Sequence, residues 1–386
     1  MTLKWEKVRL GDVAELQRGF DLPSTKRIEG EIPIVSSSGI TGFHVEAKAK
    51  APGVVTGRYG SIGDVFYLEQ DFWPLNTSLW VKDFHGNDEK FIYFLLSNFD
   101  FKKFSDKTGV PGVNRNDLHA VNVLLPPLSE QKKIAQILST WDKAISVTEK
   151  LLTNSQQQKK ALMQQLLTGQ KRLLDENGVR FSGDWNSSKL GDLFNFKKGK
   201  GLSKSDLSES GINKCILYGE LYTKYAEIAY EVISRTNSSD GQLSEPGDIL
   251  LPASTTTSGI DLANATALSE GGILLGGDIN ILRPKVRLSS PFLAYFLTHM
   301  KKNEISSRAQ GITIIHLYGG DLKSIDIVLP STVQEQQKIA TVLSAADAEI
   351  STLEKKLACL KDEKKALMQQ LLTGKRRVKV DEAVAV

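Results

Sequence analysis

The nine-residue segment ALMQQLLTG occurs twice, at residues 161–169 and 366–374, and this duplication constrains the fold more than any other feature. The match extends backward into SEQKKIAQILSTWDKAISVTEKLL and QEQQKIATVLSAADAEISTLEKKL. The same number of residues separates Glu130 from Gly169 and Glu335 from Gly374, so neither copy has an insertion. A constant length is typical of a continuous helix with a fixed partner.

Both copies carry apolar residues at alternating steps of four and three, which is the heptad pattern of a left-handed coiled coil. The apolar positions are Ile134, Leu138, Trp141, Ile145, Leu152, Leu162 and Leu166 in the first copy, and Ile339, Leu343, Ala346, Ile350, Leu353, Leu357, Leu360, Leu367 and Leu371 in the second. Polar residues also occupy the seam, where they cost stability but can fix the register. They are Thr148, Ser155, Lys159 and Lys364.

Each helix is expected to end at its Thr-Gly pair, because glycine readily adopts the left-handed conformation that terminates a helix. Lys171 and Arg172 follow the first copy, and Lys375 to Arg377 follow the second. These cations would lie near the negative end of each helix dipole.

The regions upstream of the helices also correspond at their edges. Trp5 and LGD at 10–12 match Trp185 and LGD at 190–192, and Gly19 falls opposite Gly199. The regions end in NDLHAVNVLLP and GDLKSIDIVLP, and the β-rich, glycine-punctuated sequences between these edges share little identity. The pattern predicts an α+β protein with two mixed α/β domains and two long helices.

The predicted boundaries follow from the repeat. They are a first domain at 1–128, a helix at 129–170, a linker at 171–184, a second domain at 185–333, a helix at 334–375 and a tail at 376–386. The second domain starts close to the end of the first helix and itself leads into the second helix. The two helices are therefore expected to pair antiparallel, with the domains at opposite ends and related by a pseudo-twofold axis.

Composition limits the class of protein further. The 386 residues allow two or three domains. Cys215 and Cys359 lie far apart without a CxxC spacing, which favours a reducing cytosol over a disulfide framework or a thiolate metal site. The N-terminus lacks the apolar segment of a signal peptide, and no apolar run approaches membrane-spanning length. A formal net charge of +4 permits nucleic-acid binding without requiring it.

Motifs for catalysis are missing from the sequence. A DNA adenine methyltransferase would need Asp, Asn or Ser before Pro-Pro-aromatic, but Pro126–Pro127 lies between leucines. A nucleotide-driven nuclease would need a P-loop, and neither Gly199–Lys200 nor Gly374–Lys375 continues as one. The five histidines lack a metal-binding spacing and no GxSxG elbow occurs, so we expect no catalytic residue, metal or cofactor in this chain.

Two variable domains joined to two near-identical helices resemble the specificity subunit of type I restriction–modification enzymes. The resemblance is carried by LPPLSEQKKIAQIL, LPSTVQEQQKIATVL and the twin ALMQQLLTG, and it covers essentially the whole chain. It implies that each domain reads one half of a split, asymmetric site on double-stranded DNA. It also implies that the helices set the gap and dock two modification subunits, which methylate adenine with S-adenosylmethionine, and that restriction subunits join the same core in the cytoplasm.

GRYGSIGDVFYLEQDFWPLNTSLWV in the first domain looks like a target-recognition segment of that family. Its three glycines allow close backbone approach around Arg58, which suits guanine or phosphate, beside Tyr59 and Ser61. The alternative is a plain β-turn. Three further groups have two interpretations each. The first two groups are either loop residues or DNA contacts, and the third either caps the next helix or strand or contacts DNA. The groups are Ser36, Ser37 and Ser38; Asn76 and Thr77; and Asn114 and Arg115.

The second domain contains YGELYTKY and LLGGDINILRP, which also look like target-recognition segments. Glu220 could accept a hydrogen bond from a cytosine amino group and Lys224 could bind phosphate, beside Tyr218 and Tyr222. Part of this segment is equally expected in the core. Thr255, Thr256 and Thr257 form a hydroxyl run that is either a flexible loop or a DNA-facing one. Asn280 is a weaker candidate, because its glycine-rich surroundings favour a turn.

The helices carry a second apolar stripe that a two-helix seam does not need. It comprises Ile137, Val147, Leu151, Met163 and Leu167, with Val342, Met368 and Leu372 in the other copy. Met163, Leu167, Met368 and Leu372 are the predicted docking residues for partner subunits. The alternative is that the helices pack against their own domains. For the whole chain, the alternative function is a coiled-coil scaffold with two protein-binding domains.

Overall fold

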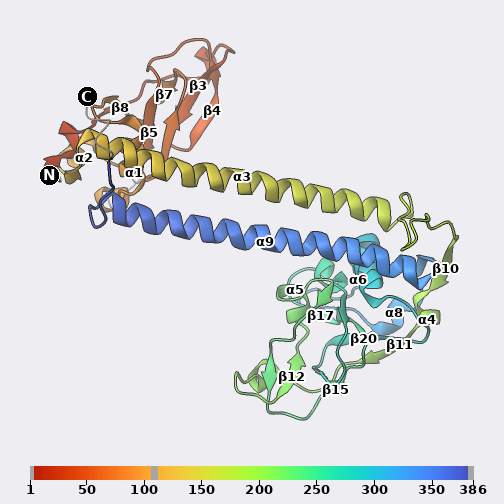
Figure 1. Cartoon of the computed structure of the whole chain (residues 1–386). Coiled ribbons are helices and arrows are strands. Elements are labelled where there is room, and N and C mark those ends of the chain that lie inside the picture. Colours follow the sequence, from red (N-terminus) through yellow and green to blue (C-terminus); the bar gives the residue numbers. More distant parts are fainter. Residues whose placement is uncertain (1–3, 106–111, 381–386) are drawn as a thin grey trace. The chain divides into compact units, whose positions relative to one another are not determined.

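The computed structural model describes residues 4–105 and 112–380, and the chain folds into two compact units. The first unit comprises residues 1–151 and 353–386, and the second comprises residues 152–352. Each unit therefore contains one globular domain, the N-terminal part of one long helix and the C-terminal part of the other (Figure 1). Within the described ranges, no helix has the length and apolar character needed to cross a membrane.

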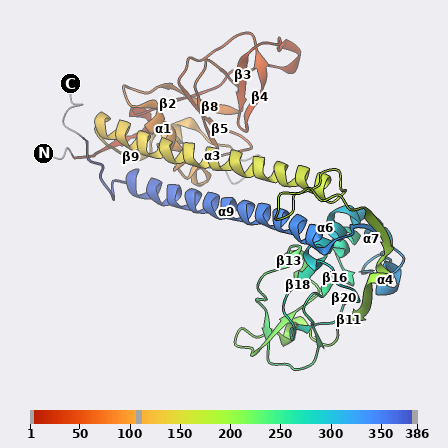
Figure 2. The same cartoon turned by 45° about the vertical axis from the view of Figure 1, so that its right-hand side comes forward.

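The domain of the first unit contains sheets with the strand orders β2-β8-β5-β6, β4-β3-β7 and β1-β9. The β3–β4 hairpin lies on the outer side of this domain, beyond β5 and β8 as seen from the adjacent long helix (Figures 1 and 2). The strands are β1 (Glu6–Arg9), β2 (Glu15–Arg18), β3 (Ile32–Ser36), β4 (Gly39–His44), β5 (Gly53–Gly57), β6 (Val65–Leu68), β7 (Trp73–Pro74), β8 (Ser78–Asp83) and β9 (Asn122–Leu125). The helices are η1 (Leu10–Asp12), η2 (Ser24–Lys26), α1 (Glu89–Ser97), η3 (Phe101–Phe104) and α2 (Arg115–His119).

The domain of the second unit has sheets ordered β11-β20-β16-β18-β13, β14-β12-β19-β15, β10-β22 and β17-β21. The strands are β10 (Trp185–Lys189), β11 (Phe194–Lys198), β12 (Asn213–Ile216), β13 (Ile228–Ala229), β14 (Arg235–Thr236), β15 (Gln242–Leu243), β16 (Ile249–Pro252), β17 (Ser254–Thr255), β18 (Thr266–Leu268), β19 (Leu274–Leu275), β20 (Ile279–Pro284), β21 (Ile315–His316) and β22 (Asp326–Pro330). The helices are α4 (Leu190–Leu193), η4 (Lys204–Asp206), α5 (Glu220–Thr223), η5 (Gly259–Ala263), α6 (Ser290–Met300), α7 (Lys302–Ser307) and α8 (Gly319–Leu322).

The two domains share one topology despite their low mutual identity. The order β2-β8-β5-β6 recurs as β11-β20-β16-β18, and β1-β9 recurs as β10-β22. In the smaller sheet, β3 pairs parallel with β7 and antiparallel with β4, as β12 pairs with β19 and β14. The second domain adds β13 and β15 at sheet edges. The repeat that the sequence shows only at its boundaries therefore extends through both domains.

The long helices are α3 (Leu128–Leu166) and α9 (Val333–Leu371), and both end as their sequence predicts. Gly169 and Gly374 have φ values of 72° and 70°, in the left-handed region. The Lys171 N–H donates to Gln165 O and the Arg376 N–H donates to Gln370 O, each at 3.0 Å, which closes the helix end. Each glycine also contacts an indole, Trp185 for Gly169 and Trp5 for Gly374, where a larger residue would crowd the ring.

The heptad seam is confirmed in both units. Its apolar residues are buried where the helices meet a domain and half-buried elsewhere, as expected for a pair of helices without further cover. In the first unit Lys364 pairs with Asp142 at 2.5 Å and Lys361 with Glu149 at 2.8 Å. Residue numbers rise on one helix as they fall on the other, so the helices run antiparallel. In the second unit Lys159 of the seam pairs with Asp347 at 2.5 Å, the equivalent of the Lys364–Asp142 pair.

A second ion pair, here called the terminal ion pair, repeats at the start of each long helix. In the first unit the Arg377 guanidinium donates to the carboxylate of Glu130 (Nε to Oε2, 2.9 Å), and in the second unit Arg172 donates to Glu335 (Nη2 to Oε2, 2.6 Å). Both carboxylates are buried. Burial opposes the ionisation of Glu130, but hydrogen bonds from Arg377 and Trp5 keep the pKa of this carboxyl below its ordinary value. The pair fixes the end of one long helix to the beginning of the other.

The glutamine after each of these glutamates joins the long helix to its domain. Gln131 accepts from the N–H of Asp88, the N-cap of α1, at 3.0 Å and donates to Pro126 O at 2.9 Å. Gln336 likewise accepts from the N–H of Ser289, the N-cap of α6, at 2.9 Å and donates to Pro330 O at 3.1 Å. The Glu-Gln dipeptide of each repeat therefore specifies both the helix pair and the position of the domain helix.

The core of each unit combines its domain with both long helices. In the first unit Leu10 and Phe91 cluster with Ile134 of α3 and Leu371 of α9. The second unit repeats this cluster with Leu190, Phe292, Ile339 and Leu166.

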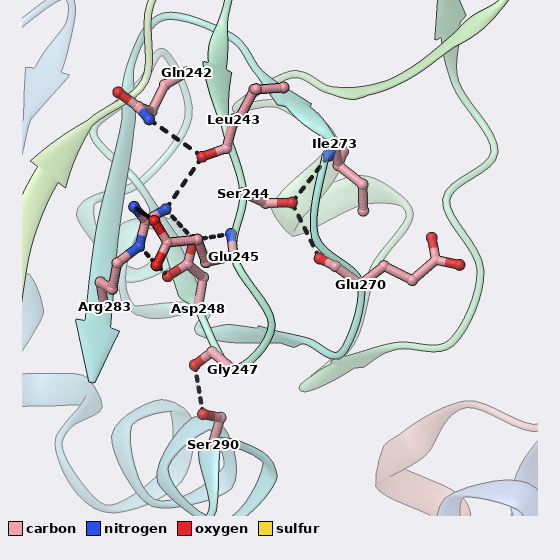
Figure 3. A network of polar contacts seen from close by, with 10 residues as sticks. All are labelled: Gln242, Leu243, Ser244, Glu245, Gly247, Asp248, Glu270, Ile273, Arg283 and Ser290. Atoms are coloured by element: carbon pink, nitrogen blue, oxygen red, sulfur yellow. Dashed lines mark hydrogen bonds and ion pairs between the residues drawn. The ribbon is translucent and has the colours of Figure 1, made fainter. Parts of the chain in front are cut away.

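An internal polar network fixes the segment around β15 in the second unit (Figure 3). Arg283 on β20 donates to Asp248 through Nε at 2.9 Å and through Nη2 at 2.7 Å, and it also pairs with Glu245 at 2.5 Å. The Ser244 hydroxyl joins the same segment to Glu270 O at 3.0 Å and accepts from the Ile273 N–H at 3.0 Å (Figure 3). The Arg283 charge is thus neutralised inside the domain and is not presented at the surface.

Candidate nucleic-acid interface

An open cleft of 880 Å³, here called the first cleft, lies on the domain of the first unit where β2 ends and α2 begins. Its lining is mostly polar and carries more positive than negative side chains. The charged and amide residues are Glu15, Gln17, Arg18, Asp21, Arg58, Lys82, Asn114 and Arg115. Four of the residues predicted from the sequence meet here: Arg58, Tyr59, Asn114 and Arg115.

The backbone of Arg58 is held from two sides immediately after β5. Its N–H donates to Thr77 O at 2.9 Å, and its carbonyl accepts from the Val113 N–H at 3.0 Å. The preceding Gly57 leaves no room for a side chain, because a Cβ there would lie 1.9 Å from Ser61 O. The strand and the glycine-rich turn together place Arg58 at the rim of the first cleft.

The Arg58 guanidinium lies over the Tyr59 ring, 4.5 Å from its centroid. Tyr59 itself packs on Gly112, where a Cβ would come within 2.3 Å of the ring. This contact holds the guanidinium against the ring. A guanidinium can bind guanine or phosphate with two parallel hydrogen bonds.

The polar residues at the start of α2 have two roles. Asn114 caps the helix, because its side chain accepts from the Asn116 N–H at 3.0 Å, and it lines the first cleft at the same time. Arg115 is the exposed first residue of α2 and lies in the same cleft. The capping alternative is therefore confirmed for Asn114, and DNA contact by Asn114 and Arg115 stays a prediction.

The other candidates of the first domain lie outside this lining. Ser36 is buried and its hydroxyl bonds within its own turn to Gly39 O at 3.2 Å, so a DNA-contact role is wrong for it. Ser37 donates its N–H to the Thr77 hydroxyl at 3.4 Å, and Ser38 is exposed next to it. Ser61 lies in the turn against Gly57. Asn76 donates to Asp21, which belongs to the cleft lining.

Gln17, Arg18, Asp21 and Lys82 line the first cleft and were missed from the sequence. The signal available was Gly19, which matches Gly199 in the repeat. A Cβ at Gly19 would lie 2.2 Å from Leu75 O, and one at Gly199 would lie 1.9 Å from Gly276 O. The two residues before each glycine end a strand at the cleft.

A second cleft, of 240 Å³, occupies the equivalent place in the other domain. The Ala253 N–H donates to Asp278 O at 2.7 Å and its carbonyl accepts from the Leu317 N–H at 2.9 Å, the same two bonds that hold Arg58. Ala253 therefore stands where the first domain has Arg58. The polar and aromatic side chains of the lining also differ, and they are Phe196, Lys197, Lys198, Asp278, Asn280, His316, Tyr318 and Lys323.

Asn280 is the predicted residue that the second cleft contains. Its Nδ2 donates to Leu317 O at 2.9 Å and the side chain is largely buried, so it positions the loop before α8. The His316 and Tyr318 rings stack 6.2 Å apart at the same place. Three lysines and this stacked pair distinguish the second cleft from the first, whose cations are mostly arginines.

The prediction that Glu220 accepts from a base is wrong. Glu220 is buried, and its carboxylate accepts from the Leu217 N–H at 2.8 Å, from Lys224 at 2.7 Å and from Ser234. Lys224 is thereby paired within the domain. Tyr218 and Tyr222 form a ring pair 6.5 Å apart beside this group, outside the lining of the second cleft. The segment supports the fold of the domain.

The hydroxyl run divides between the interior and the surface. Thr255 lies on β17, is fully buried and shares a hydrogen bond of 2.8 Å with Thr257, so a DNA-facing role is wrong for it. Thr256 and Thr257 are exposed, and Thr257 also donates to Asp261 at 2.5 Å.

The docking prediction is wrong for Leu167 and Leu372. They are 1% and 4% exposed and belong to the cores of the second and first units. Met163 and Met368 are half-buried against the same cores. The stripe is covered at these ends by the protein's own domains, the alternative that the sequence also allowed. Val147 and Leu151 of the same stripe stay about half exposed.

The comparisons with known proteins agree with this repeated architecture. The model of the type I restriction modification DNA specificity domain matches residues 2–154 and again residues 182–361. This chain belongs to that family, and it carries the DNA specificity domain twice.

Similar proteins are specificity subunits of the same kind. The chain is 27% identical to the type I restriction enzyme MjaVIII specificity subunit of Methanocaldococcus jannaschii, over 97% of this chain and 93% of that protein. It is 29% identical to the putative MjaX specificity subunit of the same organism, over 75% and 68%. The crystal structure of a type I S subunit from M. genitalium shares the fold, with a TM-score of 0.66, 18% identity and 96% of each chain covered.

Proposed function

We propose that this chain is the non-catalytic specificity subunit of a cytoplasmic type I complex, and that each cleft reads one half of a bipartite, asymmetric DNA site. One observation carries the proposal: the two clefts lie at equivalent backbone positions and have different linings. The common backbone places the two clefts at equivalent positions, and their different side chains allow each cleft to recognise a different DNA sequence.

The first cleft suits direct readout by arginine. Arg58 and Arg115 can each bind guanine through O6 and N7 or bind a phosphate, and the contact with the Tyr59 ring restricts the position of the Arg58 guanidinium. The second cleft offers Lys198 and Lys323 for phosphates, with the His316–Tyr318 pair as an aromatic surface. The two half-sites are therefore expected to differ in base composition as well as in order.

In the proposed complex, the long helices α3 and α9 act as a spacer and bind the other subunits. Two modification subunits would dock on the matched repeats and methylate adenine at N6 with S-adenosylmethionine, and restriction subunits would join them. The half-exposed Val147 and Leu151 are apolar surface that α3 still offers to such a partner. A homologous fold was solved in work on complex assembly and conformational transition of the type I R-M system, with a TM-score of 0.54.

The reading role of the first cleft is tested with Arg58→Ala in the purified complex. Dissociation constants are measured for the native DNA site and for sites altered one base pair at a time, after sequencing of methylated adenines has defined the motif. Loss of a bidentate contact is expected to weaken binding roughly 10- to 100-fold and to relax discrimination at one position of one half-site. Lys50→Ala is the matched control, because Lys50 is an exposed cation of the same domain outside the cleft.

An Arg58→Ala complex that keeps full affinity and full discrimination contradicts the role of the first cleft. A methylation motif without two separated parts contradicts the proposed function as a whole. These outcomes are distinct, because the motif is determined on the unmodified protein.

The spacer role is tested by deleting residues 145–151 and 350–356, one matched heptad from each helix. The deletion removes roughly 10 Å of helix, which corresponds to about three base pairs of DNA. The gap in the methylated motif is expected to shorten by this amount. An unchanged gap in an active complex contradicts the spacer role.

A further inference from the structure

A short hairpin at the edge of the second cleft carries an almost fully exposed isoleucine. Gln310 and His316 exchange backbone hydrogen bonds of 2.8 Å and 2.7 Å, which closes the hairpin. Gly311 has a φ of 129°, and a Cβ there would lie 2.0 Å from Ile314 O. Ile312 at the tip is 99% exposed, and Ile314 is 48% exposed. The tip, residues 311–314, therefore has a defined shape and an apolar surface.

The hairpin is anchored to the part of the domain that forms the second cleft. Its returning strand β21 pairs antiparallel with β17, so Ile315 lies opposite Thr255. The next residues along the chain, His316 to Tyr318, line the cleft. The position of Ile312 is thus tied to the surface proposed to read DNA.

The surroundings of the tip favour DNA over an apolar protein surface as its contact. Lys197, Lys198 and Lys323 lie in the adjoining cleft, and the exposed Thr256 and Thr257 continue the strand that pairs with the hairpin. Cations and hydroxyls are the groups that bind phosphate and sugar. An apolar tip among them is suited to the one large apolar group at the edge of a base pair, the methyl group of thymine.

We propose that the tip enters the major groove and that Ile312 contacts the methyl group of a thymine in the half-site of the second domain. The major groove admits elements as wide as a two-stranded β-ribbon, and this hairpin is closed by the single β-bridge between Gln310 and His316. The inference rests on the proposed function and deepens it, because it assigns a specificity-determining residue to one of the two readers.

The test is a double-mutant cycle that combines the removal of one thymine methyl group with the Ile312→Ala substitution. Each thymine of the half-site is replaced singly by uracil in a synthetic duplex, and binding is measured with the full-length protein in its purified complex. Burial of one methyl group corresponds to a roughly fourfold change in affinity. We expect uracil at one position to weaken binding about fourfold in the wild type and to have no effect in Ile312→Ala.

Ile212→Ala is the matched control, since Ile212 is a 78% exposed isoleucine of the same unit outside the hairpin and outside the cleft lining. This variant is expected to keep the full thymine-to-uracil difference. The comparison of thymine and uracil is made on one protein sample, so a folding defect in a variant cannot imitate the result.

Three results overturn the inference while leaving the proposed function intact. They are a thymine-to-uracil difference in Ile312→Ala equal to that in the wild type, a half-site without thymine, and a loss in Ile312→Ala of complex assembly rather than of discrimination. The absence of any bipartite motif would instead refute the proposed function itself.

Discussion

The two units of this protein are alike where they hold the chain together and different where they meet the solvent. The terminal ion pair, the seam ion pair, the glutamine at the domain helix and the indole on the C-cap glycine occur in both units. The side chains around the clefts differ at almost every equivalent position. The two copies therefore share their internal contacts and differ in the side chains of their surfaces.

The terminal ion pair is not identical in the two units, and this difference can be tested by mutation. The Trp5 indole N–H donates to Glu130 at 3.2 Å and supplements Arg377. Trp185 stands in the equivalent place, but its buried N–H has no hydrogen-bond partner among the described residues. Glu335 therefore depends on Arg172 more than Glu130 depends on Arg377.

The largest expected difference lies between two residues of the second apolar stripe, one covered by a domain and one exposed. Leu167→Ala should lower the free energy of unfolding of the second unit by about 3 kcal/mol, because it leaves a cavity in the core. Leu151→Ala on the same stripe should change the free energy of unfolding of the first unit, which contains Leu151, by less than about 0.5 kcal/mol, since Leu151 is 48% exposed. Urea unfolding measures both; equal effects would show that Leu167 is not a core residue.

The next difference is in the loss of stability when each terminal ion pair is broken. Arg172→Ala leaves a buried carboxylate unpaired and should cost the second unit about 3 kcal/mol. Arg377→Ala should cost the first unit less, because the Trp5 hydrogen bond remains. Hydrogen exchange resolved along the sequence reports each unit separately.

Arg376→Ala serves as the control for the ion-pair variants, since Arg376 is an exposed neighbour of Arg377 outside the pair. Adding Trp5→Phe to Arg377→Ala should bring the loss in the first unit up to that of Arg172→Ala. If the two single variants are equally destabilised, the indole hydrogen bond contributes nothing to the difference.

The smallest effect concerns pH. His119 Nε2 accepts from the Leu16 N–H at 2.8 Å, and burial, together with the nearby Arg115 charge, lowers the pKa of His119 below 6.5. The unfolded chain therefore binds a proton more readily, so this contribution to stability is complete above pH 6.5 and is lost as pH falls from 6.5 toward the folded pKa.

The equivalent position in the second unit is Lys323, which packs on Gly191 as His119 packs on Gly11. Stability of the first unit, measured by hydrogen exchange between pH 7.5 and 5.5, should fall more steeply than in His119→Gln. A wild-type slope no steeper than that of the variant would show that the pKa of His119 is the same in the folded and unfolded states.

The sequence predicted the helices well because their pattern is local and repeated. Heptad spacing, the C-cap glycines and the antiparallel direction depend on residues close in the chain or on connectivity. The terminal ion pair was missed, because Arg172 was assigned to the helix dipole and its actual partner, Glu335, is distant in sequence.

The sequence located residues of the first cleft where a local backbone pattern marks them. It failed where the role of a polar side chain depends on whether that side chain is buried. The glycines around Arg58 located one side of the first cleft, and Asn114 with Arg115 located another. Glu220, Ser36 and Thr255 were wrong because polar side chains satisfied inside a domain look the same in sequence as exposed ones. Arg18 was missed because a strand residue shows no such local signal.

The first unit combines the two ends of the chain, and this limits the order in which the two units can fold during translation. Residues 152–352 are contiguous, so every part of the second unit is available before translation ends. The first domain is synthesised earliest, yet its core needs Leu371 and Leu372 and its carboxylate Glu130 needs Arg377. The first domain to emerge is therefore the last to acquire its full set of native contacts.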